Sequence, residues 1–168
     1  VEVFWHFASD LRYEDRNYEV TRRTNVDGAR HALALAVAIG IKRFVYVSTA
    51  YVCGREGGLI EETPALPHQK FSNGYEASKA EAEGLLVAEC ERLGLPLTTL
   101  RPSIVIGPRS TQSAYGSETG LFSLIHAVMW IRSSQSGQMA NLRIPSCPAA
   151  EINFIPVDCV VSDMLALA

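Results

Sequence analysis

Short apolar runs alternate along this chain with longer segments in which apolar and polar positions mix. The runs 1–7, 43–48 and 96–101 are rich in β-branched and aromatic residues, as buried strands are. Two segments between them repeat apolar residues every three or four positions, as amphipathic helices do. This order predicts an α/β fold with a parallel sheet and right-handed crossovers.

The two helices between these runs have recognisable ends. The first is expected to begin at Thr24-Asn25, which are N-capping residue types, and to stop at Gly40. Its expected apolar face is Val26, Ala29, Leu33 and Val37. The second is expected from Tyr75, after the breaker Asn73-Gly74, to Leu93 before Gly94, with the face Ala82, Leu86, Cys90 and Leu93.

The last third of the chain is less regular. It holds a Gly/Ser/Pro-rich segment to Gly120, an apolar helix at 121–131, a short strand at 152–155 and a helix begun by Asp158 as its cap. The apolar helix is shorter than the roughly 20 residues that span a membrane, so we expect no membrane span. We expect instead that this helix is buried or lines a groove. We place a domain boundary at residue 107: 1–107 as the C-terminal half of a dinucleotide-binding domain, 108–168 as the start of a substrate-binding region with a further strand and helix.

Composition excludes several classes of protein. The 168 residues suffice for one domain with a core, and the net charge of −3, without a block of Lys or Arg, argues against nucleic acid as a partner. The cysteines are far apart, with no Cys-x-x-Cys: Cys53, Cys90, Cys147 and Cys159. They indicate reduced thiols in a cytoplasmic protein, with no metal site.

Tyr75 and Lys79, in "SNGYEASKAE", are the first candidate chemical pair. Spacing of four places both side chains on one face of a helix. Reduction of a carbonyl by hydride needs a proton on its oxygen, and a phenol serves best if its pKa falls from about 10 toward neutrality. A nearby ammonium favours the phenolate, so the two groups are expected to share a proton.

Other polar residues are expected at the same edge of the sheet. Ligands of parallel sheets bind beyond the carboxyl ends of the strands, where Ser48 and Thr49 follow one strand and Pro102-Ser103 another. The Thr49 hydroxyl could bond the substrate oxygen, or could merely end a strand. Asn25 could hold a water that supplies a new proton to Tyr75, or could only cap its helix.

The wording and order of these motifs resemble the extended short-chain dehydrogenases/reductases over essentially the whole chain. The motifs are "HFAS", "TNVDGARHALALA", "RFVYVSTAYVCG", "GYEASK", "LRPSIVIGP" and "INFIPVD". They look most like the thioester reductase and fatty acyl reductase branch, the male sterility-type NAD-binding proteins. Sugar-nucleotide epimerases and dehydratases contain similar sequence motifs. The resemblance implies a Rossmann-type, doubly wound parallel sheet.

Roles for single residues follow from this resemblance. It implies that Thr49 is the hydroxyl of a catalytic triad, Tyr75 the acid/base, and Lys79 its partner and a ligand of the nicotinamide ribose. The cofactor would be NADP or NAD. Ser48 would approach it, Ala8 and Ser9 would line it through their backbone, and Pro102-Ser103 would back the nicotinamide.

One feature of that family has no counterpart here. No Gly-x-x-Gly-x-x-Gly turn, which binds the pyrophosphate, follows a strand. We therefore expect either a fragment that begins near the fourth strand of the fold, lacking the N-terminal βαβ unit, or a degenerate member.

Three functions stay open at this stage. The first is an NAD(P)-dependent reductase of a small-molecule or carrier-bound acyl thioester or another carbonyl, with homodimer formation left open. The second is a nucleotide-sugar epimerase or dehydratase, for which Arg101 and Arg109 could clamp a diphosphate, although Arg101 is expected to anchor a strand end and Arg109 to be a solvated charge. The third is a non-catalytic fragment.

Overall fold

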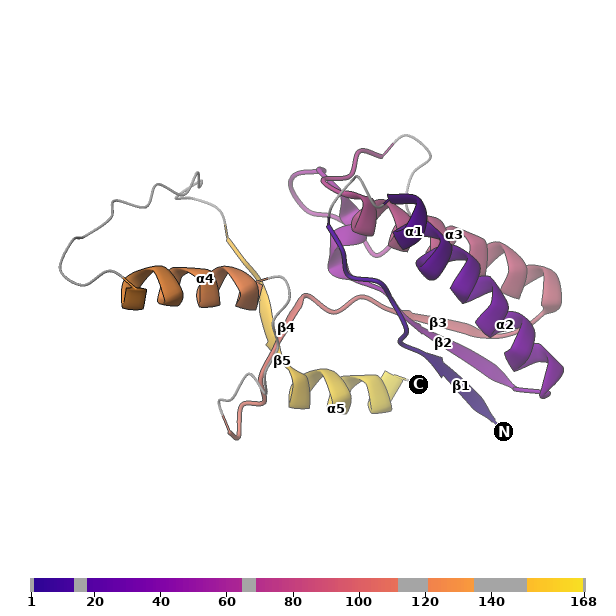
Figure 1. Cartoon of the computed structure of the whole chain (residues 1–168). Helices are drawn as coiled ribbons and strands as arrows, with labels where there is room; N and C mark the ends of the chain where they lie inside the picture. The colour runs from indigo at the N-terminus through magenta and orange to yellow at the C-terminus, as the bar shows by residue number, and fades with distance from the viewer. Residues whose placement is uncertain (1, 14–17, 65–68, 112–120, 135–150, 168) are drawn as a thin grey trace.

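Two parallel sheets organise the chain, whose computed structural model describes residues 2–13, 18–64, 69–111, 121–134 and 151–167 (Figure 1). The main sheet has the order β1-β2-β3, formed by Val3–His6, Arg43–Val47 and Leu97–Leu100. The second sheet pairs β4 (Ile104–Ile106) with β5 (Phe154–Pro156). The predicted α/β fold with a Rossmann-like parallel sheet is confirmed.

The helices lie between and after these strands. The described helices are α1 (Tyr18–Arg22), α2 (Gly28–Ala38), α3 (Gly74–Leu93), α4 (Leu121–Ser134) and α5 (Val157–Leu167). A π-helical turn, Arg23–Asp27, joins α1 to α2, and a 3₁₀ turn, Ala50–Cys53, follows β2. Gly94 closes α3 in the left-handed region, at φ 63°, as a C-terminal glycine does.

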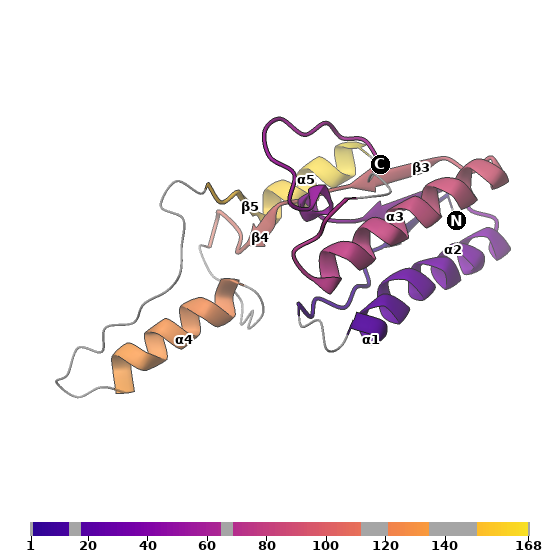
Figure 2. The ribbon, with the colours of Figure 1, turned by 90° about the horizontal axis from the view of Figure 1, so that it is seen from above.

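Helices cover both faces of the main sheet, so it has two cores (Figure 2). Phe44 and Tyr46 of β2 face α2 and α3, where they pack in a buried cluster with Leu86. Val45, the intervening residue, faces the other way and packs with Met164 of α5. Because both faces of β2 are buried, its sequence is continuously apolar rather than alternating.

The helix before β2 differs from its prediction. It begins at Tyr18 instead of Thr24, so Asn25 lies inside the π-helical turn and caps nothing. Val26, Ala29 and Leu33 are buried as predicted, but Val37 is 42% exposed.

Leu93, predicted on the apolar face of α3, is likewise 40% exposed. A 20-residue helix is about 30 Å long, and strands of four or five residues are about 15 Å long, so the last turn of the helix overhangs the sheet.

A buried ion pair fastens α3 to the end of β3. Glu83 of α3 has a side chain only 3% exposed, and it accepts hydrogen bonds from Arg101 Nε at 3.1 Å and Nη2 at 2.6 Å. Arg101 Nη2 also donates to the carbonyl of Thr63 at 2.9 Å. The expectation that Arg101 anchors the strand end is confirmed.

Asp158 joins the second sheet to α5. It lies in the first turn of α5 and not before it, and its carboxylate accepts hydrogen bonds from the backbone N–H groups of Cys159 and Arg109, each at 3.1 Å. These bonds hold the pKa of Asp158 below its usual value. Asp158 is therefore not the residue before the helix that the sequence predicted, because α5 already begins at Val157; its carboxylate fixes the loop that leaves β4.

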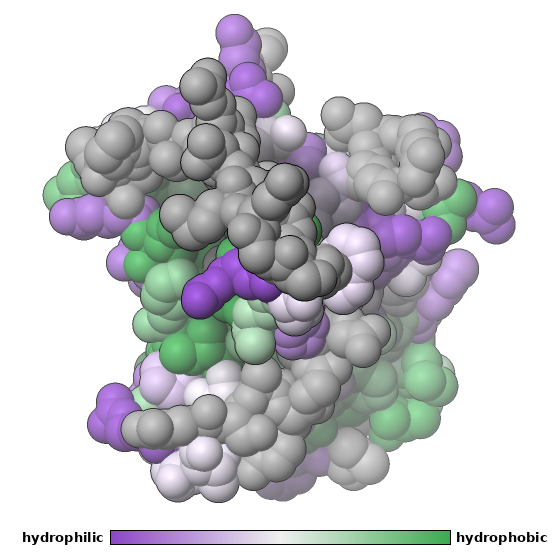
Figure 3. All heavy atoms as spheres, turned by 60° about the vertical axis from the view of Figure 1, so that its left-hand side comes forward, coloured by the Kyte–Doolittle hydropathy of each residue, from purple (hydrophilic) through white to green (hydrophobic). Residues whose placement is uncertain are grey.

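α4 is not the buried helix that its apolar sequence predicted. Its described side chains are largely exposed, among them Leu124, Ile125, Met129 and Trp130. Figure 3, which turns this side of the molecule forward, shows uncovered hydrophobic surface there. In the described part of the chain, no helix combines the length and the apolar character that crossing a membrane requires.

The outer edge of β3 borders a groove of about 980 Å³. Side chains of α3, β3 and α5 line it, including Cys90, Leu97 and Met164. The groove runs along the free edge of the sheet and does not contain Thr49 or Tyr75. Volume alone therefore does not mark the candidate chemistry of this protein.

Removing one partner of the ion pair between Glu83 and Arg101 should destabilise the protein more than the pair itself stabilises it. Replacing Arg101→Gln leaves a buried carboxylate unpaired, and should lower the free energy of unfolding by about 3 kcal/mol. The double variant with Glu83→Gln should lose less than the sum of the single variants. Urea unfolding measures this coupling, and Glu89→Gln, which opens the exposed pair with Arg92 on the same helix, should change stability by less than about 0.5 kcal/mol. Strictly additive losses would contradict this prediction.

Candidate active site

The first turn of α3 is held by a reciprocal set of capping bonds. Asn73 Oδ1 accepts from the backbone N–H of Glu76 at 2.9 Å, and Glu76 accepts in return from Ser72 N at 2.7 Å and Asn73 Nδ2 at 3.0 Å. Gly74 is required here, because a Cβ at this position would lie 2.7 Å from the Tyr18 ring. The start of the helix, and therefore Tyr75, is fixed from both sides.

Thr49 lies two residues beyond the end of β2, with Tyr75 as its partner. Its Oγ1 accepts from the backbone N–H of Tyr51 at 3.3 Å, which caps the 3₁₀ turn. Its side chain is also among the hydrogen-bonding groups that lower the pKa of the Tyr75 phenol. Thr49 therefore ends the strand beside Tyr75, and its bond to a substrate oxygen stays a prediction.

The pKa of Tyr75 contradicts the prediction of a lowered value. Burial of the ring, together with the charge of Tyr13, raises it to about 12, although the bond with Thr49 lowers it in part. Lys79 is not among the groups that shift it. In this structure Tyr75 is a protonated phenol at neutral pH, suited to donating a proton.

Lys79 is directed to β2 instead of sharing a proton with Tyr75. Its side chain is 1% exposed, its Nζ donates to the carbonyl of Val47 at 2.8 Å, and it lies 4.2 Å from the centre of the Tyr46 ring. Burial lowers the pKa of Lys79 from 10.5 to about 8. The spacing of four placed both residues on the buried side of α3 as predicted, but the ammonium is stabilised by a backbone carbonyl and an aromatic face.

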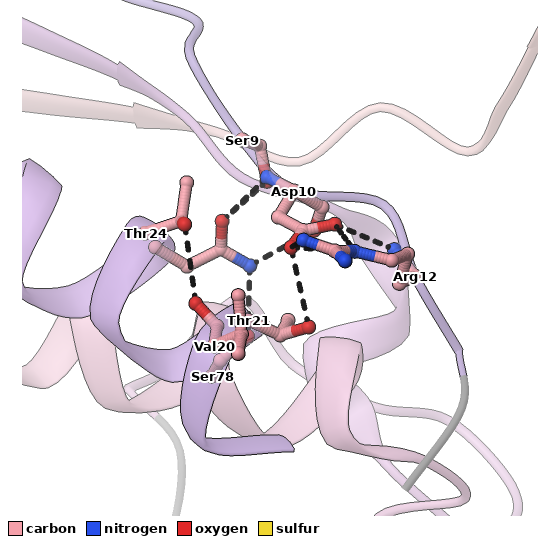
Figure 4. A network of polar contacts seen from close by, with 8 residues as sticks. Ser9, Asp10, Arg12, Val20, Thr21, Thr24 and Ser78 are labelled. Carbon is pink, nitrogen blue, oxygen red and sulfur yellow. Dashed lines mark hydrogen bonds and ion pairs between the residues drawn. The ribbon is translucent and has the colours of Figure 1, made fainter. Parts of the chain in front are cut away.

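Asn25 is a structural connector whose hydrogen-bonding capacity is full. Its Oδ1 accepts from Ser9 Oγ at 3.1 Å and Asp10 N at 2.7 Å, and its Nδ2 donates to Asp10 O at 3.1 Å and Ser78 Oγ at 2.9 Å. Figure 4 shows Ser9, Asp10 and Ser78 converging on this amide. A primary amide has two donors and two acceptor sites. The Asn25 amide therefore has no donor or acceptor site left for a water in this structure, and a catalytic role for Asn25 stays a prediction.

This amide ties the loop after β1 to α3. Ser78 Oγ, which accepts from Asn25, donates in turn to the carbonyl of Tyr75 at 2.8 Å. On the loop side, Asp10 accepts from Arg12 at 2.6 Å and 2.9 Å and from Thr21 Oγ1 at 3.4 Å. Nothing in the spacing of Asn25 or Ser78 along the sequence signals this connection.

The remaining predicted residues gather at the carboxyl edge of the main sheet. Ala8 and Ser9 follow β1, and Pro102 and Ser103 follow β3, with the Pro102 carbonyl accepting from Ala50 N at 2.9 Å. Ser48 N donates to the Leu100 carbonyl at 2.7 Å. The structure thus brings these residues to one edge, while their contacts with a cofactor stay a prediction.

Two groups at this edge fit the nicotinamide end of a dinucleotide. Ser48 Oγ is buried and has no hydrogen-bond partner among the described residues, and an ammonium has three donors of which Lys79 uses one on Val47. Both groups can bond hydroxyls of a ribose or an amide. The described residues contain no glycine-rich turn for the pyrophosphate.

Tyr13 was missed by the sequence reasoning. Its ring meets Tyr75 edge to face, with centroids 5.5 Å apart and planes at 70°. It comes from the charged loop after β1, where no periodic pattern assigns a direction to any side chain. No signal in the sequence marks this contact.

Comparisons with known proteins agree with the motifs and the fold. The model of an NAD-binding family described as "Male sterility protein" matches residues 1–164. The 3beta-hydroxysteroid-dehydrogenase/decarboxylase isoform 1 of Arabidopsis thaliana is 30% identical over 109 residues, 64% of this chain and 25% of that protein. The dTDP-D-glucose 4,6-dehydratase of Mus musculus is 34% identical over 112 residues, 64% of this chain and 30% of that protein.

A solved structure is similar over nearly the whole chain. It is the terminal R domain from the myxalamid PKS-NRPS biosynthetic pathway, with a TM-score of 0.74 and 30% identity, covering 96% of this chain and 38% of that one. The chain spans less than a third of the length of the two curated relatives, 25% and 30%.

Removing the Asn25 amide should destabilise the protein markedly. Asn25→Ala leaves the buried backbone groups of Asp10 and the Ser78 hydroxyl without this partner, so the free energy of unfolding should fall by about 2–4 kcal/mol. Thr24→Ala is the matched control, because Thr24 is exposed and its hydroxyl bonds only the Val20 carbonyl, at 3.1 Å, among the contacts described. Equal unfolding midpoints for Asn25→Ala and Thr24→Ala in urea would refute the connector role.

Lys79 should make stability depend on pH in the alkaline range. Because its pKa is lowered from 10.5 to about 8, the unfolded chain binds a proton between these values that the folded chain has released. Stability must therefore rise with pH across this interval. Urea unfolding should show the wild type gaining stability relative to Lys79→Met as the pH rises from about 8 to 10.5. Parallel pH profiles would show that Lys79 keeps its ordinary pKa.

Proposed function

This chain belongs to the NAD-binding male sterility protein family of extended short-chain dehydrogenases/reductases, and on that premise we propose that it carries the catalytic part of a thioester reductase. The cofactor class is a nicotinamide dinucleotide, NADP or NAD. The reduced carbonyl belongs to a small-molecule or carrier-bound acyl thioester in this proposal.

The hydroxyl pair of Thr49 and Tyr75 is the observation that carries the proposal. Tyr75 is buried, its pKa is lowered in part by the Thr49 side chain, and it keeps its proton, with a pKa of about 12. A protonated phenol beside a second hydroxyl can bind a carbonyl oxygen and then protonate it. These are the needs of a reduction rather than of a proton abstraction.

Each residue has a task in this reaction. When bound, the reduced nicotinamide supplies the hydride that adds to the acyl carbon. Thr49 donates a hydrogen bond to the carbonyl oxygen, Tyr75 transfers its proton to that oxygen, and Lys79 has donors beyond the one used on Val47 for the nicotinamide ribose. When the C–S bond of the resulting hemithioacetal breaks, the Tyr75 phenolate takes back the hydroxyl proton. The aldehyde leaves, and the thiolate leaves as a thiol after taking a proton from solvent.

The contacts of Arg101 favour a thioester over a nucleotide sugar. A diphosphate needs free cationic donors, whereas Arg101 already binds the Glu83 carboxylate and the Thr63 carbonyl. The exposed apolar side chains of α4, such as Met129 and Trp130, offer surface for a hydrocarbon. The similarity to the R domain over 96% of this chain supports the same choice.

A nucleotide-sugar epimerase or dehydratase is the second candidate. Its support is the 34% identity with a dTDP-D-glucose 4,6-dehydratase. Elimination of water needs a further acid or base beside the phenol. Glu76 is the carboxylate whose charge acts on Tyr75, and its oxygens already accept from Ser72 and Asn73. Among the described residues this arrangement favours reduction.

The assigned roles predict a non-additive pattern of activity loss. In the full-length protein, Tyr75→Phe should lower kcat about 100-fold or more, because the proton donor is lost. Lys79→Ala should have a similar effect, and the double variant should be little worse than either, because the loss of either the proton donor or the ribose ligand already prevents the same step. Thr49→Ala should lose less, since one hydrogen bond is removed. Undiminished turnover in Tyr75→Phe would end the assignment.

The substrate class is read in the same assay. NAD(P)H absorbance is followed with an acyl-CoA thioester, and UDP- and GDP-sugars are tested in parallel for new products. Oxidation of the reduced cofactor with the thioester supports the reductase. Sugar conversion without net consumption of cofactor would replace it by the epimerase or dehydratase.

A further inference from the structure

A half-exposed aromatic ring covers the candidate catalytic phenol. Tyr13 is 48% exposed, whereas Tyr75, which it contacts edge to face at 5.5 Å and 70°, is 7% exposed. One side of the Tyr13 ring therefore packs on Tyr75 while a large part of the ring remains accessible.

The position of Tyr13 is fixed by the chain before it. The Asn25 amide holds both backbone groups of Asp10, and the Asp10 carboxylate holds Arg12 through its backbone N–H at 3.1 Å and its guanidinium. Tyr13 is the next residue. The same amide is bonded to Ser78 of α3, so the ring and the helix that carries Tyr75 share one connector.

A second half-exposed tyrosine lies close by. Tyr51 follows Thr49 by two residues and is 38% exposed. Its charge raises the pKa of Tyr13, and the charge of Glu76 raises the pKa of both. Tyr13 is the accessible ring that contacts the buried phenol.

On the basis of the proposed reductase function, we propose that Tyr13 is a substrate-positioning residue. Its ring holds Tyr75 in place on one side and packs on the apolar acyl group of the thioester on the other. It thereby selects for the length of the acyl chain next to the reacting carbonyl.

The chemistry of an aromatic ring supports this class of ligand. A tyrosine ring buries apolar surface when it packs on hydrocarbon or planar groups. A longer acyl chain covers more of the ring and gains more. The raised pKa of Tyr75, for which burial and then the charge of Tyr13 are the largest causes, agrees with the ring contact.

Three variants of the full-length protein test the proposal kinetically. Tyr13→Ala should raise KM for decanoyl-CoA about tenfold, the effect of leaving about two CH₂ groups uncovered, and KM for acetyl-CoA much less. Tyr13→Phe keeps the ring and should restore the wild-type KM. Leu11→Ala is the control, because Leu11 lies in the same loop with a similar exposure of 46%. Equal effects of Tyr13→Ala on both thioesters, or an effect no larger than that of Leu11→Ala, would overturn the proposal.

A measurement without turnover separates this proposal from the reductase function. NMR of ¹³C-labelled tyrosine, with the Tyr75 signal assigned through Tyr75→Phe, reports the pKa of Tyr75. The pKa should fall from about 12 in Tyr13→Ala, which removes both the ring and its phenol charge, and should fall less in Tyr13→Phe, which removes the charge alone. An unchanged pKa in Tyr13→Ala would refute the ring contact, whatever the activity. A wild-type protein that reduces neither thioester would refute the reductase function and, with it, the acyl contact.

Discussion

Parallel pairing of β2 with both of its neighbours is the constraint on which the site depends. Because β1, β2 and β3 run in one direction, the chain leaves all three at the same edge, and the residues that follow them meet there. Thr49 and Pro102 reach that edge from neighbouring strands, and their segments are joined by a backbone bond between Ala50 and Pro102. β2 contributes further through the Val47 carbonyl, which receives Lys79. The central strand thus both orders the sheet and orients the ammonium.

Hydrogen bonds of buried side chains fix the loops that follow the strands. Loops that hold functional residues need a rigid scaffold, and here a buried amide at Asn25 supplies it for the segment after β1. Glu76 does the same for the first turn of α3, and Glu83 for the exit from β3. Each of these three groups is buried and polar, and each bonds a segment far from it or a helix start that would otherwise lack partners.

The parts that could be predicted are those that periodic patterns determine. The apolar run of β2 and the stripe containing Leu86 follow from burial on two faces, and the spacing of Tyr75 and Lys79 follows from helix geometry. The position of Asn25 could not be predicted, because the residue types that cap helices are also those that make buried amide networks. The partner of Lys79 is a backbone carbonyl, which is the same for every sequence. The exposure of α4 depends on what packs against it, and composition does not contain that information.

The π-helical turn at Arg23–Asp27 makes this segment sensitive to insertions and deletions. A π turn contains one residue more than an α turn, and one residue corresponds to a rotation of about 100° around the helix axis. If one residue were deleted here, the turn could become α-helical, and α1 and α2 would form one continuous α-helix. The residues of α2 and its hydrophobic stripe would be unchanged. The residues before the deletion would then turn by that angle, and Thr21 would leave the side that Asn25 shares with Asp10. Chain length in this turn is therefore as restricted as residue identity, a constraint that substitution scans cannot detect.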